Sequence, residues 1–536
     1  MEIKRSTFFV LLTILCISIN LSVEICLFIT DQYVFERSLN EHGIPYATKD
    51  ELENYKNLTS GNSTNLKLAQ RKAALVDAAF NGVRISVGLI TTLIIGYLSD
   101  RFGRKCAFAL LLGGETLQII MICIITLLKL NEWLTIVSGL FEAFCGGGLL
   151  TINAQISAAI MDASLHKGKQ RRENKDRKTK KSHTDTLWTH FAIFDGMANL
   201  SMSAGNLVAG SLIYRYGFEI SIATCACIFV PSLISITFLP ETHKRNSSKT
   251  KQGESHSLKV ALNIPERSVC EDCCLDNANS QSDNQQSKRT SEKLQICKHL
   301  DPILIMLSVI IFLTSLGAIS DVQYLFVYLM GAPFLWDAQK ISIYVGVVDV
   351  VGSFLSVILA YFLMKFEGKR KTVIEVKSNE TEDAGQLENV TNQSNSHHKL
   401  VVLVIALSIT LILLICNRFL VGIAYMFSVQ TANLLVYIAI LPRLMKSFIV
   451  PVLRTMFILC TASSKHGMVQ SVCGFIVRIG LLTSLSGLPA LYAATVTAFP
   501  GAVFMVVCVL LAIALIVNMF LPVCIKRRYR SENQMN

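Results

Sequence analysis

The stretch RISVGLITTLIIGYLSDRFGRK (residues 84–105) joins a run of apolar residues to a cluster of charge and glycine. The apolar part belongs to a block at 76–98, and about 20 such residues suffice to cross the hydrocarbon core of a bilayer as a helix. The cluster GYLSDRFGRK at 96–105 then lies at the end of that helix. Lys and Arg at such a place mark the cytosolic side of a membrane. The stretch therefore predicts a membrane-spanning helix followed by a short charged turn.

Similar apolar blocks recur along nearly the whole chain, which is 52% apolar and only 16% charged. This composition is typical of an integral membrane protein. The first block is too long for a signal peptide and has no small-residue cleavage site. We predict an all-α integral membrane protein with twelve transmembrane helices in two six-helix halves. The spans are expected at 7–29, 76–98, 106–128, 133–160, 187–211, 218–239, 301–329, 340–364, 400–425, 432–457, 468–491 and 499–522.

The distribution of Lys and Arg predicts the orientation of these spans. The connection at 166–181 holds nine Lys or Arg and the turn at 101–105 holds three, whereas the connections at 129–132 and 212–217, on the opposite side, hold one each. Basic connections stay on the cytosolic side. An even number of spans then places both termini in the cytosol.

Long hydrophilic segments divide the chain. Residues 1–240 form the first half, 241–300 form a flexible cytosolic linker rich in polar residues, and 301–536 form the second half with a cytosolic tail. The segment 30–75 is expected outside and carries glycosylation sequons at Asn57 and Asn62. Three further sequons, which the same topology places in the cytosol, are at Asn379, Asn389 and Asn392.

Cysteines do not predict a disulfide framework, because all sixteen lie in spans, at their edges or in the linker. Cys270 and Cys273 have the spacing of zinc ligands. The alternative, unstructured cytosolic thiols, is the simpler interpretation, and no metal site is predicted.

The cluster at 96–105, called the GYLSDRFGRK motif below, is expected to latch one helix bundle to the other. Gly96 would let a neighbouring helix approach closely, and Gly103 would allow the tight turn. Asp100 would pair with a positive charge at the membrane edge. An ordinary positively charged loop is the alternative. The basic residues that would hold the turn against the cytosolic face are Arg101, Arg104 and Lys105.

A weaker copy of the motif, LMKFEGKRK, follows the eighth span, with Gly368 placed as Gly103 is. Two halves with echoing loops indicate parallel repeats around a central cavity.

The motif, the twelve spans and the long central loop resemble the major facilitator superfamily over the whole chain. A closer resemblance is to the proton-coupled folate transporter family. It rests on Asn81 followed by the motif, and on FDGMANLSMSAGNLVAGSLIYRYGF (194–218), FLPETHK (238–244), PFLWD (333–337) and PVLRT (451–455). The resemblance implies a solute carrier that works by alternating access.

The resemblance has departures that concern the solute. The folate carrier has a functional histidine in its seventh span and a lysine in its eleventh. This chain reads TSLGAIS at 314–320 and TVTAFP at 495–500, with no histidine within the seventh span and no lysine near the Phe-Pro. The solute is therefore left open, with an anionic, folate-like molecule as one reading.

Ionisable residues within spans are costly and usually functional. The candidates for transport and proton coupling are Asp195, Asp162, Arg454, Arg478, Arg84 and Glu24. The resemblance implies that Asp162 and the arginine of PVLRT, Arg454, serve transport. The alternative for Asp162 is a structural role at the membrane edge. The alternative for Arg454 is a side chain that merely extends to the cytosolic surface. Arg84 and Arg478 would meet an anionic solute or pair internally, for instance Arg84 with Asp77.

Asp195 is the candidate for proton coupling. It is expected near the middle of the fifth span, where a carboxylate is costly unless paired or protonated. It also falls where the resemblance implies a proton-coupling glutamate. The alternative is a carboxylate held ionised by an arginine such as Arg478.

These features predict a secondary active transporter of a small organic solute, coupled to protons. No phosphate-binding loop, nucleophile with its base, or catalytic metal cluster is found, so neither ATP, a cofactor nor an enzyme activity is expected. No nucleic-acid partner is expected, and the oligomeric state is left open. A receptor that binds a solute without moving it is the alternative. The lack of a clear acidic dileucine signal favours the plasma membrane over the lysosomal membrane.

Overall fold

The computed structural model describes residues 5–61, 63–171, 179–241, 302–319, 322–378, 384–461 and 466–535. Every regular element within them is helical, which confirms the all-α prediction. The linker after Glu241, with its cysteines, lies outside the described residues, as do Asn62 and Asn379. The side chains of Asn389 and Asn392 are likewise not described, and neither is the burial of Gly368.

The first half contains α1 (Arg5–Glu41), α2 (Leu52–Gly61), α3 (Ser63–Phe102), α4 (Arg104–Leu127), η1 (Glu132–Leu134), α5 (Thr135–Phe144), α6 (Gly148–Arg171) and α7 (Thr179–Phe238). The second half contains α10 (Pro302–Thr314), η2 (Ser315–Ile319), α11 (Val322–Met330), α12 (Ala338–Ser378), α13 (Ala384–Ala424), α14 (Val429–Ile438), α15 (Ile440–Arg443), η3 (Lys446–Phe448), α16 (Ile449–Leu459), α17 (His466–Thr495) and α18 (Ala502–Met535).

Ten helices of the described chain are long and apolar enough to cross a membrane. One of them, Ile193–Phe238, has 46 residues and is interrupted at Gly217, whose φ of 77° is not helical. A further apolar helix, Pro302–Gly317, is shorter than a full span and is followed by α11. A multi-pass membrane protein is therefore established, and twelve spans stay a prediction.

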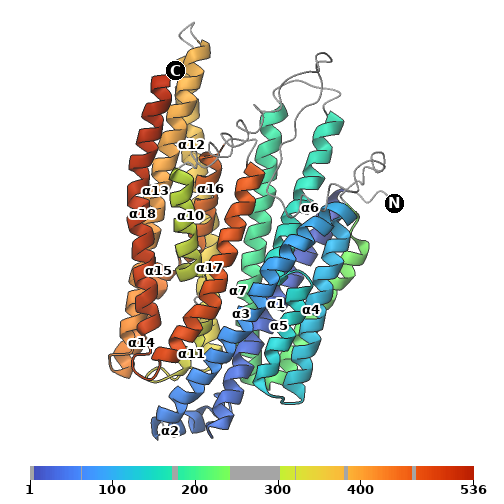
Figure 1. Ribbon diagram of the computed structural model, residues 1–536, viewed down its shortest axis with the longest axis vertical. Coiled ribbons are helices and arrows are strands. Elements are labelled where there is room, and N and C mark those ends of the chain that lie inside the picture. The colour runs from blue at the N-terminus through green and yellow to red at the C-terminus, as the bar shows by residue number, and fades with distance from the viewer. Residues whose placement is uncertain are drawn as a thin grey trace, which may run out of the picture.

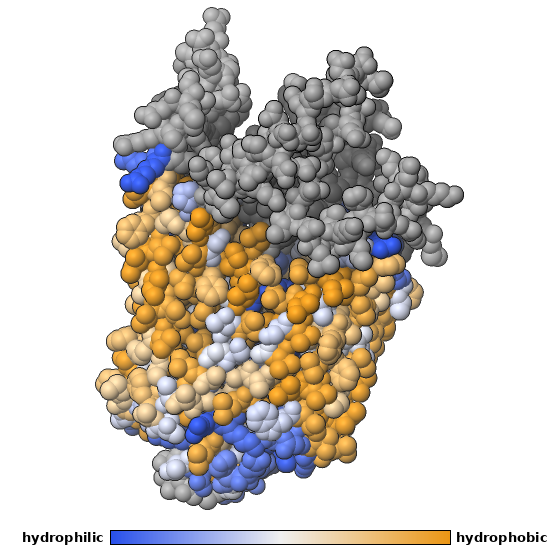
Figure 2. All heavy atoms as spheres, in the orientation of Figure 1, coloured by the Kyte–Doolittle hydropathy of each residue, from blue (hydrophilic) through white to orange (hydrophobic). Residues whose placement is uncertain are grey.

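The helices stand side by side, with α2 at one end, and the start of α1 and the end of α18 towards the other (Figure 1). We call these the α2 end and the terminal end. Large apolar side chains such as Ile90 and Leu93 are about two-thirds exposed, at 66% and 65%. Apolar residues cover most of the face seen in Figure 2, and hydrophilic ones gather at the α2 end. This is the surface expected of a protein surrounded by lipid.

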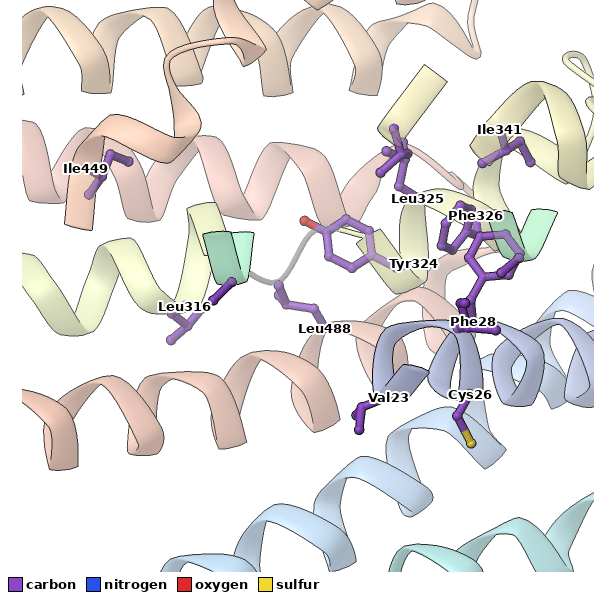
Figure 3. Packing of buried hydrophobic residues seen from close by; sticks show 14 of the residues in the cluster. Val23, Cys26, Phe28, Leu316, Tyr324, Leu325, Phe326, Ile341, Ile449 and Leu488 are labelled. Carbon is purple, nitrogen blue, oxygen red and sulfur yellow. The ribbon is translucent and has the colours of Figure 1, made fainter. Parts of the chain in front are cut away.

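The two halves meet along α7 with α12 and along α3 with α17. Buried apolar residues from both halves fill the interior (Figure 3). In particular, the rings of Phe28 in α1 and Phe326 in α11 pack edge to face, with centroids 4.8 Å apart. Such aromatic pairs add to the stability of the contact between halves.

The fourth span is not the continuous helix predicted at 133–160. It is broken between α5 and α6, where Gly146, Gly147 and Gly148 have φ values of 130°, 76° and 69°. Residues with a side chain rarely adopt these values, so three consecutive glycines permit the break. Gly88 of α3 lies against it, because a Cβ added to Gly88 would be 2.9 Å from the Cα of Gly147. In a membrane, non-helical backbone is tolerated where protein or a cavity covers it.

The glycosylation prediction has a geometric basis. Asn57 is exposed on α2, at the end opposite the termini. If this end faces outside, the loss of mass on glycosidase treatment should be absent in an Asn57→Gln/Asn62→Gln double variant. An Asn389→Gln/Asn392→Gln variant is the control and should keep the shift. A shift that persists in the first variant would contradict the orientation.

Candidate functional site

The GYLSDRFGRK motif forms a charged network at the terminal end. Arg104 Nε donates to Asp162 Oδ2 at 2.9 Å, and another nitrogen of its guanidinium lies 2.9 Å from Asp100 Oδ1. The same guanidinium donates to Ser99 Oγ at 2.8 Å, and Ser99 donates to Gln155 Oε1 at 2.6 Å. The motif and Asp162 at the end of the fourth span are therefore one assembly.

Glu241 completes this network, although sequence reasoning did not assign it a role. Its carboxylate accepts hydrogen bonds from the backbone N–H groups of Arg104 at 2.9 Å and Lys105 at 3.1 Å. The first N–H groups of a helix lack intrahelical partners and favour negative charge, so Glu241 stabilises the start of α4. The available signal was the FLPETHK stretch, which contains Glu241.

The expected latch between the two bundles needs correction. The contacts described above join α3, α4, α6 and the end of α7, all within the first half. Arg101 bonds to Tyr97 of its own helix. A Cβ added to Gly96 would meet nothing within 4 Å, so this glycine does not mediate a close helix approach. In this conformation the described contacts of the motif hold the first half together.

Gly103 is the glycine of the motif that the fold requires. Its φ is 107°, and an added Cβ would lie 2.4 Å from a carboxylate oxygen of Glu241. We expect Gly103→Ala to destabilise the protein by about 1–3 kcal/mol, from backbone strain and displacement of Glu241. Gly96→Ala, the matched control, should be neutral or slightly stabilising because alanine favours a helix. Thermal unfolding in detergent measures both, and equal midpoints would refute the difference.

Arg84 is paired within the first half. Its guanidinium lies 3.1 Å from Glu142 Oε2 of α5 and 3.2 Å from Asn81 Oδ1. The internal partner is Glu142 rather than the suggested Asp77, because a neighbouring helix presents its carboxylate directly to Arg84. Glu142 is buried. Its charge offsets that of Arg84, which leaves Arg84 less available to a solute.

Arg478 of α17 instead reaches across to the first half. Its guanidinium donates to Thr92 Oγ1 of α3 and, at 2.9 Å, to Thr151 Oγ1 of α6. The two hydroxyls are themselves 2.9 Å apart. Both groups are neutral, and among the described residues no ion pair joins a carboxylate to this arginine. Arg478 is therefore a half-buried cation at the contact between halves whose charge is not balanced by a neighbour.

The broken fourth span contributes to the surroundings of Arg478. Thr151 is the fourth residue of α6, which begins at the break. The N-terminus of a helix carries unpaired N–H groups and a partial positive charge. A guanidinium, two hydroxyls and this helix start thus lie together. Sequence reasoning identified Arg478 but missed the threonines and the break, although CGGG at 145–148 was a visible signal.

Asp195 lies elsewhere than expected. It is 22 residues before Gly217, or about 33 Å along the helix, which is close to the full thickness of a hydrocarbon core. It therefore lies towards the terminal end rather than at mid-membrane. Its Oδ2 is 2.7 Å from Arg454 of α16, with side chains 51% and 45% exposed. The arginine that pairs with it is Arg454, not Arg478.

Glu24 of α1 lies between α1 and α7. Its Oε1 accepts a hydrogen bond from Asn206 Nδ2 at 3.0 Å, and a Cβ on Gly205 would touch its side chain at 3.0 Å. The side chain is neither fully buried nor exposed. It is thus a partly buried carboxyl group held by a neutral amide.

The halves are joined differently at the two ends. At the α2 end, Tyr55 Oη donates to the Met330 carbonyl and Gln70 Nε2 donates to the Val327 carbonyl at 2.6 Å. Tyr55 is fully buried and Gln70 is 3% exposed. Near the terminal end the halves are linked by the half-exposed ion pair of Asp195. The contact between halves is therefore tight at the α2 end.

Comparison with known proteins gives the same fold. Residues 63–376 match the family model of the Major Facilitator Superfamily. A human protein described as the lysosomal proton-coupled steroid conjugate and bile acid symporter SLC46A3 is 26% identical over 212 residues. That match covers 39% of this chain and 42% of the relative.

Solved structures are similar at low sequence identity. The human organic anion transporter MFSD10 (TETRAN) is 14% identical with a TM-score of 0.51, over 96% of this chain and all of that one. A mutant of the nucleoside transporter NupG is 10% identical with a TM-score of 0.47, over 94% of this chain and 99% of that one. The first likeness supports the fold alone.

The family match spans more than half of the chain, and the helical bundle agrees with it. The relatives are transporters rather than enzymes. This chain belongs to the Major Facilitator Superfamily and is a multi-pass membrane protein.

Proposed function

We propose that this protein is a proton-coupled symporter of a small organic anion that works by alternating access. The observation that carries the proposal is Arg478, a half-buried cation between the halves that contacts only neutral hydroxyls among its described hydrogen-bond partners. A charge removed from water is costly without a counter-charge. An anionic solute would supply that charge.

The groups around Arg478 suit a carboxylate or a sulfate. A guanidinium can donate two parallel hydrogen bonds to such an anion, and hydroxyl groups can donate further ones. The start of α6 adds a favourable partial charge. Because these groups come from both halves, a bound anion would be held at the surface along which the halves move.

The unequal contacts at the two ends support alternating access. Buried hydrogen bonds close the α2 end, whereas the ion pair between Asp195 and Arg454 is half exposed. A half-exposed ion pair contributes only about 0–1 kcal/mol, so it can break and re-form in each cycle. With the termini in the cytosol, this conformation would be closed to the outside.

Coupling to protons is part of the proposal. It is supported by the description of the human relative as proton-coupled and by two carboxyl groups of the described helices, partly buried Glu24 and Asp195 at the contact between the halves. The proton gradient, rather than a cofactor, would drive uptake. The relative's description also names steroid conjugates and bile acids, which are organic anions. We propose a solute of that chemical class, with a folate-like dicarboxylate as the second candidate.

We propose the plasma membrane as the location, on the absence of a clear acidic dileucine signal. The human relative is described as lysosomal, so the two membranes are the alternatives. Fluorescence microscopy of the tagged full chain with markers for both membranes distinguishes them.

The test uses the purified full chain in liposomes. Uptake of labelled estrone sulfate, a steroid conjugate, should increase as the outside pH falls from neutral to about 5.5, and should collapse with a protonophore. Unlabelled folate tests the second candidate by competition, and neutral estrone is the control without an anion. Binding of both anions without any uptake would make the protein a receptor and overturn the proposal.

A further inference from the structure

Glu115 of α4 is a buried carboxyl group that the proposed anion site does not use. Its side chain is 1% exposed, and neither of its oxygens has a hydrogen-bond partner among the described residues. Helices α1, α3, α5, α6 and α7 pack around α4. Water is therefore excluded from this group on all sides.

The charged and titratable groups that act electrostatically on Glu115 come from several of these helices. They are Glu142 of α5, Arg84 of α3, Cys26 of α1 and Cys145 after α5, with Cys225 of α7 adjoining Cys26. Arg84 is the cation among them, and its guanidinium is hydrogen-bonded to Glu142. Buried Asp31 of α1 also acts on Arg84, so this one arginine lies near three buried carboxyl groups.

An ionised carboxylate in this position would be expensive. Burying a charge without hydrogen bonds costs several kcal/mol even after the surroundings relax. The charge of Arg84 is already offset by Glu142, and two neighbouring carboxylates repel each other. A neutral carboxylic acid avoids both costs.

We propose that Glu115 is protonated in this conformation and that Glu115, Glu142 and Arg84 form a proton-binding site in the first half. This inference rests on the proposed coupling to protons and adds a site beyond Asp195. The proton is bound on a carboxyl oxygen of Glu115. Its release to water leaves a carboxylate that shares Arg84 with Glu142.

The position of this site connects it to the anion site. A Cβ on Gly114 would lie 2.4 Å from the Cβ of Cys145, at the break in the fourth span. The carboxyl of Glu142 lies directly against the backbone of Gly148, three residues before Thr151. The proton site and the contact of Arg478 with Thr151 therefore adjoin the same break, and a change of charge on one side can shift the other.

Infrared spectroscopy of the purified full chain tests the inference without a substrate. At about pH 7.5, an ordinary glutamate is ionised, so a carboxylic-acid C=O band reports a retained proton. The band should lose one component in Glu115→Gln, whose neutral amide resembles the protonated acid. Glu53→Gln, an exposed carboxyl on α2, is the matched control and should leave the band unchanged.

A second variant keeps the test informative if Glu115→Gln folds poorly. Glu115→Asp keeps a carboxyl group and should keep the band at a shifted position. An acid band that is identical in the wild type, Glu115→Gln and Glu115→Asp would overturn the inference. Failure of estrone sulfate uptake would instead count against the proposed function, because the infrared measurement involves no solute.

Discussion

Replacing Arg478 by glutamine is expected to weaken binding of estrone sulfate about 10- to 100-fold, with a matching loss of uptake at low solute concentration. Hydrogen bonds to a charged group contribute about 1.5–3 kcal/mol, and each 1.4 kcal/mol is a factor of ten in affinity. Glutamine still offers hydrogen-bonding groups near Thr92 and Thr151, but it removes the positive charge of Arg478, which these neutral hydroxyls do not balance. Binding to the protein in detergent, measured by calorimetry, gives the affinity directly.

Two controls separate the charge from general damage. Arg478→Lys keeps the positive charge but lacks the planar guanidinium that donates two parallel hydrogen bonds, so it should retain part of the affinity. Arg101→Gln removes an exposed arginine at the terminal end, whose side chain bonds to Tyr97, and should bind as the wild type does. If Arg478→Gln binds estrone sulfate with unchanged affinity, Arg478 is a structural link between halves rather than the anion site.

The helical architecture could be predicted from sequence because a bilayer imposes one requirement on every span. Backbone groups in hydrocarbon must be satisfied internally, so long apolar blocks become helices whatever their neighbours are. The blocks at 106–128 and 400–425 accordingly correspond to the candidate spans Arg104–Leu127 and Leu400–Ala424. The sequence also predicted that the second span ends at the GYLSDRFGRK motif, and in the structure Gly103 separates α3 from α4.

The partners of buried charges could not be predicted in the same way. Glu142 lies 58 positions after Arg84, and Glu241 lies 137 positions after Arg104. Packing between helices determines these pairs, and spacing along one helix does not reveal them. Hydropathy also hid the break after α5, because glycines within an apolar block still count towards a span.

The expected depth of Asp195 was wrong for a related reason. Its distance into the fifth span was counted from a start at 187, within a region whose described structure is a continuous helix from Thr179. Counting back from the break at Gly217 gives a position near the terminal end. A well-defined turn is therefore a better origin for such a count than the start of an apolar block.

Asp195→Asn is expected to abolish concentrative uptake driven by a proton gradient while preserving exchange of solute across the membrane. In the structure the carboxylate is paired with Arg454, and the pair joins the two halves. When the halves move, the pair must separate, and Asp195 then loses the cation that it contacts in this conformation. The separated carboxylate is the group that we expect to carry the coupled proton. Asparagine keeps the size of the side chain but cannot take up a proton. Exchange needs no net proton movement, so it should survive.

The measurement compares accumulation and exchange of estrone sulfate in the same liposomes. Wild-type accumulation should increase as the outside pH falls to about 5.5, because a lower outside pH increases the proton gradient directed inward. Accumulation by Asp195→Asn should stay at the equilibrium level at every pH. Asp195→Glu, the matched control, retains a carboxyl within reach of Arg454 and should retain part of the pH dependence. A variant with asparagine that still concentrates the solute would remove Asp195 from proton coupling and leave its pair with Arg454 as a contact between the halves.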